Sequence, residues 1–369
     1  MTKLIIVGSG ILGLSVAEYL TREMFQGIDI KIITNNHKFS GSKAAAANLA
    51  TKGQMFARDP HFELKLHGKK IYKNWIHNLI KEDNCSLSID SIFKNGEGID
   101  YFTSINNRDK HYLRVKQDDN LLKKRNLPTN SILKIDENKI KYLDESWVDA
   151  QELLNILKNV LIKRGVLFEA NDFCQKKYHE IMIDKNIAHL IFCTGAWTKS
   201  LLENLNIQLP LQMTKQERLT LGSTFFGDNI IQNFKNHFIL SEKISNDLKS
   251  KVTFSGDINK TFISSSSLRI KSIHDMNMEE LNSKNNIILE LAKNFLEDSP
   301  NLKEKYFYNS NEISQLNGFR VGYGHTEIIL DKLNISESKI KAFVCSGAHK
   351  SGYLFAPVIG RIVQNLLFS

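Results

Sequence analysis

A short apolar run followed by a three-glycine turn constrains the fold of this chain most. Lys3 to Val7 is apolar and ends at a glycine, which is typical of a buried parallel strand. Residues 8–13 then read Gly-Ser-Gly-Ile-Leu-Gly, Leu14 to Met24 has helical spacing, and Ile28 to Ile33 is a second apolar run. This order of strand, glycine turn, helix and strand predicts a βαβ unit.

The three glycines of the turn suit a phosphate-binding loop. Gly8 permits a tight turn, Gly10 lets a pyrophosphate approach the backbone, and Gly13 allows close contact between helix and strand. Because the motif follows a strand and opens a helix, it predicts dinucleotide binding. The second strand ends at Thr34 and Asn35 without the usual carboxylate. Either side chain can bind a ribose, so this position leaves the identity of the cofactor open.

Composition bounds the class of protein. With 369 residues, 42% hydrophobic and 24% charged, the chain matches average globular proteins and can form two domains. Cys85, Cys174, Cys193 and Cys345 form no CxxC pair, which argues against a metal site and for a reducing compartment. No run reaches the roughly 20 apolar residues of a membrane helix, so we expect a cytoplasmic protein without a membrane span.

The charge is less ordinary than the composition. Lys and Arg number 49 against 40 Asp and Glu, which leaves a net charge of +9. Because the basic residues are spread along the chain, solubility is favoured as the reason, and an anionic partner such as nucleic acid stays open. The sequence does not set the number of subunits, and a homo-oligomer also stays open.

Further elements follow from hydrophobic spacing. Helices are predicted for His61 to Ile80, from an N-cap at Asp149 to Gly165, for Met278 to Leu296 and for Tyr353 to Leu367. The polar segments between them contain strand-like runs. Short strands are expected at Val166 to Phe168, His189 to Thr194, Arg218 to Leu221, Val252 to Phe254, Thr261 to Ile263 and Ile340 to Cys345, with only weak strands between residues 81 and 141.

Five further segments occur in an order typical of one flavoprotein superfamily. Ser40 to Leu49 is a run of small residues beside which an extended cofactor can lie. The others are Trp147-Val148-Asp149, Thr194-Gly195-Ala196-Trp197, Gly318-Phe319-Arg320 and the glycine-rich segment from Gly347 to Gly360. Together with the first turn they resemble the D-amino-acid oxidase superfamily of FAD-dependent oxidoreductases, and within it the glycine oxidases fit best.

The resemblance implies an α/β fold in which an FAD-binding Rossmann-like domain of the glutathione-reductase type is interleaved with a mixed-sheet α+β substrate domain. Residues 1–85, 142–210 and 314–369 are expected in the FAD-binding domain. Residues 86–141 and 211–313 are expected in the substrate-binding domain. The implied reaction is oxidation of an amine or amino acid, with hydride transfer from the carbon next to nitrogen to flavin N5 and an imine as product.

The resemblance also assigns site residues. Arg320 corresponds to the arginine that fixes the substrate carboxylate, a task that suits its planar fork, and Lys350 stands where glycine oxidases have a second arginine. The helix dipole of the last helix and Lys350 would stabilise a reduced anionic flavin. The implied cofactor contacts are Gly8, Gly10, Ile11, Leu12, Gly13, Thr34, Asn35, Ser42, Lys43, Ala47, Asn48, Leu49, Gly195, Trp197, Gly347, Lys350, Ser351, Gly352, Tyr353 and Leu354.

Two departures from the glycine oxidase pattern and one comparison with sarcosine oxidases bear on function. Val321 follows the arginine where glycine oxidases have proline, and no aromatic residue between Val252 and Ser267 clearly matches the one that closes over small amino acids. Sarcosine oxidases tether flavin through a cysteine just after the arginine. Val321 and Gly322 stand there, so FAD is expected to bind non-covalently. His325, His349, Tyr323 and Tyr353 are interpreted as wall or packing residues.

Two other functions stay open. The oxidase half of the bacterial wobble-uridine tRNA modification enzyme resembles the chain in the same motifs, and it removes a carboxymethyl group from a nucleoside amine. The net charge of +9 favours such a partner, whereas the scattered basic residues do not. The altered loop after Arg320 also allows a catalytically degenerate flavoprotein that serves as a binding or maturation partner.

Overall fold

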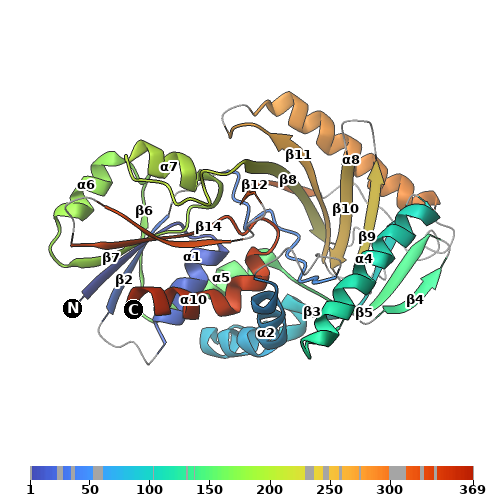
Figure 1. Ribbon diagram of the computed structural model, residues 1–369, viewed down its shortest axis with the longest axis horizontal. Coiled ribbons are helices and arrows are strands. Elements are labelled where there is room, and N and C mark those ends of the chain that lie inside the picture. Colours follow the sequence, from blue (N-terminus) through green and yellow to red (C-terminus); the bar gives the residue numbers. More distant parts are fainter. Residues whose placement is uncertain are drawn as a thin grey trace.

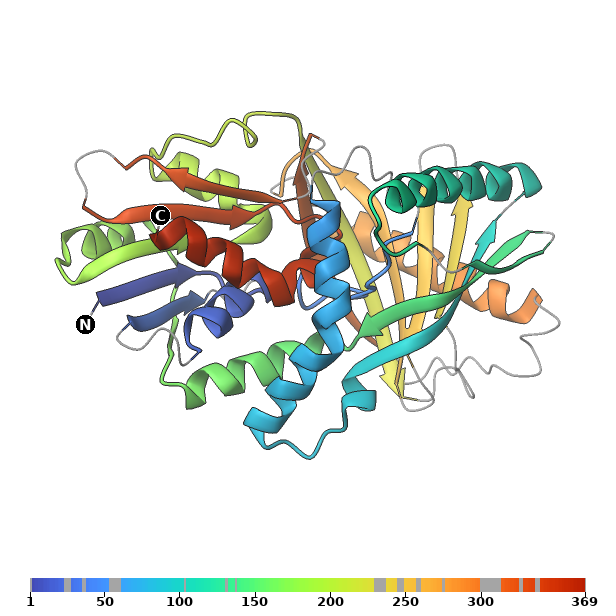
Figure 2. The ribbon, with the colours of Figure 1, turned by 60° about the horizontal axis from the view of Figure 1, so that its bottom comes forward.

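The computed structural model has two β-sheets side by side along its long axis (Figure 1). It describes residues 2–22, 28–34, 38–52, 61–102, 104–129, 132–136, 138–228, 237–243, 249–256, 260–273, 276–298, 313–324, 328–335 and 339–368. Both ends of the chain lie in the part that contains the six-stranded sheet (Figure 2). None of the described helices is both long and apolar enough to cross a membrane.

The six-stranded sheet confirms the βαβ unit. Its strands, in spatial order, are β13 (Ile329–Leu333), β14 (Lys341–Ser346), β7 (Ile187–Phe192), β1 (Thr2–Val7), β2 (Ile28–Thr34) and β6 (Leu167–Ala170). All neighbouring strands are parallel except β13 and β14. Leu4 and Ile6 face one hydrophobic core, and Ile5 and Val7 face another. Burial on both faces explains the uninterrupted apolar run of β1.

Four helices cover the face to which Leu4 and Ile6 point. They are α1 (Ile11–Leu20), α2 (Phe62–Asp83), α5 (Ala150–Lys163) and α10 (Gly352–Phe368). Small residues let them touch at the backbone, since a Cβ on Gly68 would lie 2.0 Å from the Leu354 carbonyl oxygen. Asp149 caps α5 as predicted, and its Oδ1 accepts hydrogen bonds from the Gln151 and Glu152 amides at 3.0 and 3.2 Å. The other face packs against α6 (Gln175–Ile183) and the turn η3 (Gly195–Trp197), which leads into α7 (Thr198–Asn204).

The eight-stranded sheet is mixed, as expected. Its order is β12 (Ser314–Tyr323), β8 (Glu217–Asp228), β11 (Lys260–Ile270), β10 (Lys249–Gly256), β9 (His237–Lys243), β3 (Phe93–Phe102), β5 (Lys139–Val148) and β4 (Ile132–Asp136). Only β3 and β9 pair in parallel. Helix α8 (Met278–Asp298) packs on one face through Ile288 and Ala292. Helix α4 (Ile105–Lys124) meets the other face over β3 and β5 (Figure 2), and the short α3 (Ile89–Ile92) precedes β3.

Two features differ from the sequence-based expectations. Helix α4 occupies a segment for which only weak strands were expected. Of its apolar side chains, Val115 and Leu122 are buried, whereas Ile105 and Leu113 are exposed, so its apolar spacing is weak. Strand β12 and most of β5, both expected with the FAD-binding domain, are hydrogen-bonded into the eight-stranded sheet. Sheet membership therefore does not follow the predicted domain boundaries, which stay a prediction.

Candidate active site

A cavity of about 980 Å³ lies between the two sheets. This volume is at the upper end of the range of ligand pockets, about 300–1,000 Å³. Its walls come from the carboxyl end of β1, the start of α1, the 40–52 loop, η3, the inner face of the eight-stranded sheet and the 347–353 loop. A site at the carboxyl ends of parallel strands is where open α/β sheets bind their ligands.

The glycine turn opens onto this cavity. Gly8 has φ +111° and its amide donates to the Ile33 carbonyl at 2.8 Å, and a Cβ there would lie 2.4 Å from the Cys193 carbonyl oxygen. A Cβ on Gly13 would lie 2.0 Å from the Gly8 carbonyl oxygen. These two glycines are thus required by the tight turn and the close helix contact. Gly10 is the N-cap of α1, so the first amides of the helix face the cavity.

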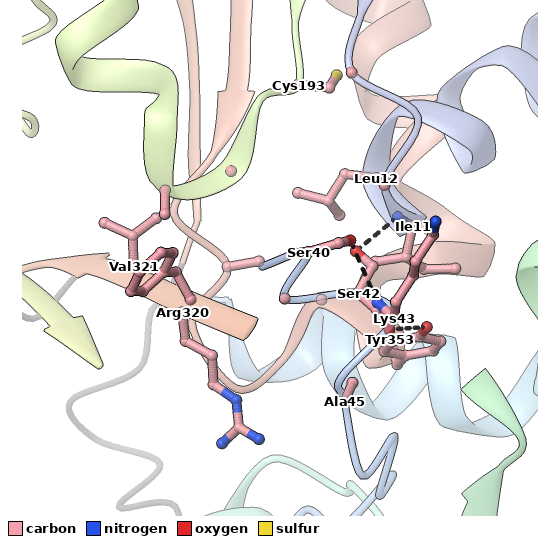
Figure 3. Close-up of a pocket in the computed structure, with 18 of the residues that line it drawn as sticks. Ile11, Leu12, Ser40, Ser42, Lys43, Ala45, Cys193, Arg320, Val321 and Tyr353 are labelled. Carbon is pink, nitrogen blue, oxygen red and sulfur yellow. Dashed lines mark hydrogen bonds between the residues drawn. The ribbon is translucent and has the colours of Figure 1, made fainter. Parts of the chain in front are cut away.

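The 40–45 loop lies between the start of α1 and strand β12, which carries Arg320 (Figure 3). Ser42 Oγ accepts a hydrogen bond from the Ile11 amide at 3.0 Å, and the Tyr353 hydroxyl donates to the Ser42 carbonyl oxygen at 2.8 Å. On its other side the loop crosses β12 at the backbone. A Cβ on Gly41 would lie 2.2 Å from the Phe319 carbonyl oxygen, and one on Gly318 would lie 2.6 Å from that of Ser40. The crossing fixes β12 against the glycine turn.

Arg320 projects from β12 into the open part of the pocket, past the 40–45 loop (Figure 3). The side chain is half-buried, and burial lowers the pKa of its guanidinium. Gly222 on the neighbouring strand leaves room for it, since a Cβ there would lie 3.3 Å from Arg320 Nη2. Among the described residues no carboxylate forms an ion pair with Arg320. A desolvated cation of this kind favours an anionic ligand.

The 347–353 loop places further basic groups at the same wall. Gly347 and His349 have positive φ of +76° and +43°, and the His349 amide donates to the Val321 carbonyl at 3.0 Å. Burial, then the charges of Lys350, Arg320, Arg218 and Lys65, lowers the pKa of His349 to about 3. The imidazole is therefore neutral near pH 7, so it carries no positive charge at this wall.

Most of the predicted contact residues border the cavity. Within the described part of the chain, Arg320 and all predicted cofactor residues line it, except Gly13, Leu49 and Leu354. Gly13 lies against Gly8, while the Leu49 amide donates to the Ser146 carbonyl at 2.8 Å. Asn35 and His325 lie outside the described residues. The cavity shows that these residues share one site, and their individual roles stay predictions.

Several cavity residues were not anticipated. Ser9 hydrogen-bonds Thr34 through the two hydroxyl groups, and Lys52, Asp100 and His111 form part of the wall. Ser9 lies within the glycine motif, so its spacing could have suggested it. The other three belong to polar segments without a motif, and only the folded chain brings them to the cavity.

The sequence model of a family described as FAD dependent oxidoreductase, DAO, matches residues 3–366. The chain belongs to the DAO family of FAD-dependent oxidoreductases. This confirms the resemblance, and the described site fits FAD, because the N-terminus of α1 with Gly10 lines the cavity, where a helix N-terminus suits phosphates. Among curated proteins none matches this DAO family member.

Solved structures share the fold of this DAO family member. Glycine oxidase from Bacillus cereus ATCC 14579 has 17% identity and a TM-score of 0.68, covering 100% of this chain and 95% of that one. Glycine oxidase from Geobacillus kaustophilus has 14% identity and a TM-score of 0.71, with 100% and 95% covered. Iminodiacetate oxidase from Chelativorans sp. BNC1 has 14% identity and a TM-score of 0.67, with 99% and 95% covered. These likenesses confirm the predicted fold class.

Proposed function

We propose that the chain oxidises an amine that carries a carboxylate, in the manner of a glycine oxidase. The observation that supports this most directly is Arg320, a desolvated guanidinium in the cavity that has no ion-pair partner among the described residues. A substrate carboxylate would pair with the guanidinium and accept two parallel hydrogen bonds from it. Glycine and iminodiacetate, which appear in the names of the similar structures, each join an amine to a carboxylate.

The residues around the glycine turn would hold the cofactor. The α1 amides and the Ser42 hydroxyl suit the phosphates, and the 347–353 loop with Lys350 suits the flavin and the substrate. Bound FAD would supply the acceptor for a hydride from the carbon next to nitrogen. In this arrangement Arg320 orients the substrate. Lys350 adds positive charge at the same wall, and neutral His349 shapes the pocket.

Non-covalent binding of FAD is part of the proposal. Val321 and Gly322, which follow Arg320, have no nucleophilic side chain that could form a bond with flavin. Cys193 also lines the cavity, but it lies against the glycine turn, with its Cβ 3.3 Å from the position of a Cβ on Gly13. Acid precipitation of the holoprotein tests this. All yellow colour should remain in the supernatant, and colour in the washed pellet would contradict it.

Anaerobic bleaching of the flavin tests the reaction. Purified protein is mixed, in the absence of oxygen, with glycine, sarcosine, D-amino acids and amine-bearing nucleosides. The absorbance of the oxidised flavin is followed over time. Loss of the oxidised flavin band with at least one carboxylate-bearing amine is expected. A protein without yellow chromophore, or one that no amine bleaches, would contradict the proposal.

A second candidate substrate is a modified nucleoside carried by tRNA. The observation that favours it is α4, which exposes a series of basic side chains and contributes His111 to the cavity wall. These are Lys110, Arg114, Lys116, Lys123 and Lys124. Phosphate contacts weaken steeply with salt. A gel shift with bulk tRNA that disappears between low and moderate salt would favour this candidate, and no shift at low salt would exclude it.

A further inference from the structure

The eight-stranded sheet contributes two hydroxyl side chains to the cavity wall, Thr253 on β10 and Ser264 on β11. The two residues are directly paired across the strands, so their side chains lie on the same face of the sheet. Ser264 is buried, with 2% of its surface exposed, and Thr253 is half-buried. Neither belongs to a motif that relates the chain to its family, and neither has a role in the reaction proposed above.

The hydrogen of the Ser264 hydroxyl is already used inside the fold. Thr224 Oγ1 donates to the Ala44 carbonyl oxygen at 2.9 Å, and it also lies 2.9 Å from Ser264 Oγ. A hydroxyl group has one hydrogen and a carbonyl oxygen can only accept, so the hydrogen of Thr224 belongs to the bond with Ala44. The hydrogen in the second contact therefore comes from Ser264. A chain of two hydrogen bonds thus runs from Ser264 through Thr224 to the loop that borders the cavity.

This direction of the chain makes Ser264 Oγ an acceptor for any ligand. Among the described residues, Ser264 forms no side-chain hydrogen bond other than the one with Thr224. A hydroxyl oxygen carries two lone pairs, and a buried acceptor without a donor destabilises the fold. A ligand that brings an N–H group to this wall would satisfy the oxygen. A ligand that offers only lone pairs would be repelled.

Arg320 and Ser264 lie on the same face of the sheet. Strand β8 runs between β12 and β11 and pairs with both. Its Thr220 is opposite Arg320, and its Thr224 is opposite Ser264. Residues four positions apart on one strand point to the same side. The guanidinium and the acceptor therefore face the cavity that both residues line.

The distance between the two groups suits a small amino acid. The Arg320 guanidinium lies over Gly222, where a Cβ would be 3.3 Å from Nη2. Gly222 is diagonal to Ser264 across β8 and β11, a relation that corresponds to about 7–8 Å. An α-amino acid needs about 2.8 Å for each of its two hydrogen bonds, and about 3 Å separate its nitrogen from a carboxylate oxygen. The sum of roughly 8–9 Å along a bent path matches the diagonal.

We propose that Ser264 accepts a hydrogen bond from the substrate amine while Arg320 holds the carboxylate, and that Thr224 is the positioning residue that keeps Ser264 an acceptor. The inference rests on the proposed amine oxidation and names its substrate class, a primary or secondary amine with the carboxylate on the neighbouring carbon. A neutral tertiary amine has no N–H to donate. The carbon that loses the hydride is then held through both of its polar neighbours, which fixes its orientation.

Three pairs of ligands that differ only in the amine test this contact. Glycine is compared with propionate, sarcosine with butyrate, and D-alanine with 2-methylpropionate, so that carbon replaces nitrogen in each acid. Dissociation constants of the holoprotein are measured without oxygen, from the flavin spectrum or from the concentration dependence of flavin reduction. At least one amine should bind about fivefold more tightly than its acid, or better. A smaller preference in all three pairs would overturn the inference.

Substitution of Ser264 assigns the preference to its hydroxyl group. Ser264→Ala should weaken the preferred amine about tenfold and leave its acid within about twofold. Ser255→Ala is the matched control and should change neither value, because Ser255 is buried on β10, does not line the cavity and has no described hydrogen-bond partner for its hydroxyl. An amine preference that is the same in Ser264→Ala and in the unmodified protein would overturn the inference.

Substitution of Thr224 tests the direction of the hydrogen bonds. Thr224→Val has a similar shape and frees the Ser264 hydrogen, so Ser264 can then donate. Methoxyacetate, whose ether oxygen replaces the nitrogen of sarcosine, should bind no better than butyrate to the unmodified protein and about fivefold better than butyrate to Thr224→Val. Thr224→Ser retains the hydroxyl and should behave like the unmodified protein. A general loss of structure would weaken both ligands, whereas the same order of the two ligands in both proteins would overturn the positioning role.

The outcomes distinguish this contact from the reaction. If no amine reduces the flavin of the unmodified protein, the proposed function fails, and the ligand pairs still test Ser264 by binding alone. If amines reduce the flavin and Ser264→Ala leaves the preference intact, the reaction stands and only the role of Ser264 is lost.

Discussion

Replacing Arg320 with methionine separates the role of this residue in binding from the cost of burying its charge. The guanidinium lies in the cavity, burial lowers its pKa, and no carboxylate pairs with it among the described residues. If it holds the substrate carboxylate, two charge-assisted hydrogen bonds of at least about 1.5 kcal/mol each are lost in the variant. The dissociation constant of a carboxylate ligand should then rise about 150-fold, from a loss of about 3 kcal/mol.

The same substitution should stabilise the protein in the absence of ligand. A half-buried charge without a partner among the described residues destabilises the folded state, and methionine fills part of the same volume without the charge. We expect the free energy of unfolding to rise by about 1–3 kcal/mol. The assay is urea unfolding of the ligand-free protein, followed by circular dichroism.

The binding assay for this variant is a titration of the holoprotein with glycine, sarcosine and benzoate, followed by flavin absorbance. Arg361→Met is the control, because Arg361 is exposed on α10 and should change neither measurement. A change of less than about threefold in every dissociation constant would remove Arg320 from its proposed role. A lower stability of Arg320→Met would show that the guanidinium is compensated in the fold, which would refute the argument from its missing partner.

Three further predictions concern the glycine turn and the cavity wall. Gly8→Ala places a Cβ 2.4 Å from the Cys193 carbonyl oxygen at a residue with φ +111°, so the purified protein should lose FAD. The FAD content is measured as the ratio of flavin to protein absorbance. Gly96→Ala is the control and should retain FAD, because a Cβ on Gly96 would have no atom within 4 Å. Ser42→Ala removes the acceptor of the Ile11 amide and should lower the free energy of unfolding by about 1 kcal/mol in urea titrations; an unchanged value would contradict the capping role. The pKa of His349 is about 3 in the fold against 6.5 in the unfolded chain, so protons favour unfolding and stability should fall by up to about 1.4 kcal/mol per pH unit below pH 6.5. His349→Leu should reduce this slope between about pH 6 and pH 4, and the same slope in both proteins would show that other groups cause it.

The sequence was sufficient to predict those elements that depend only on residues close together in the chain. The glycine turn, the apolar strand β1 and the Asp149 cap each depend on residues within a few positions, and the structure confirms all three. The order of motifs also identified the family, because that order reflects how the chain leaves the six-stranded sheet and returns to it twice.

Other features were decided only by contacts between distant segments. Helix α4 is held over β3 and β5, and its weak apolar spacing gave no sequence signal for a helix. The crossing of Gly41 over Gly318 joins residues that are far apart in the sequence, and Lys52 meets Asp100 from a different segment 48 positions away. The burial and pairing of charged side chains depend on which segments pack together in the fold, so the sequence did not predict them. The sequence by itself therefore determined the family and the glycine turn, whereas the tertiary structure decided which side chains from distant segments meet in one cavity, Arg320 among them.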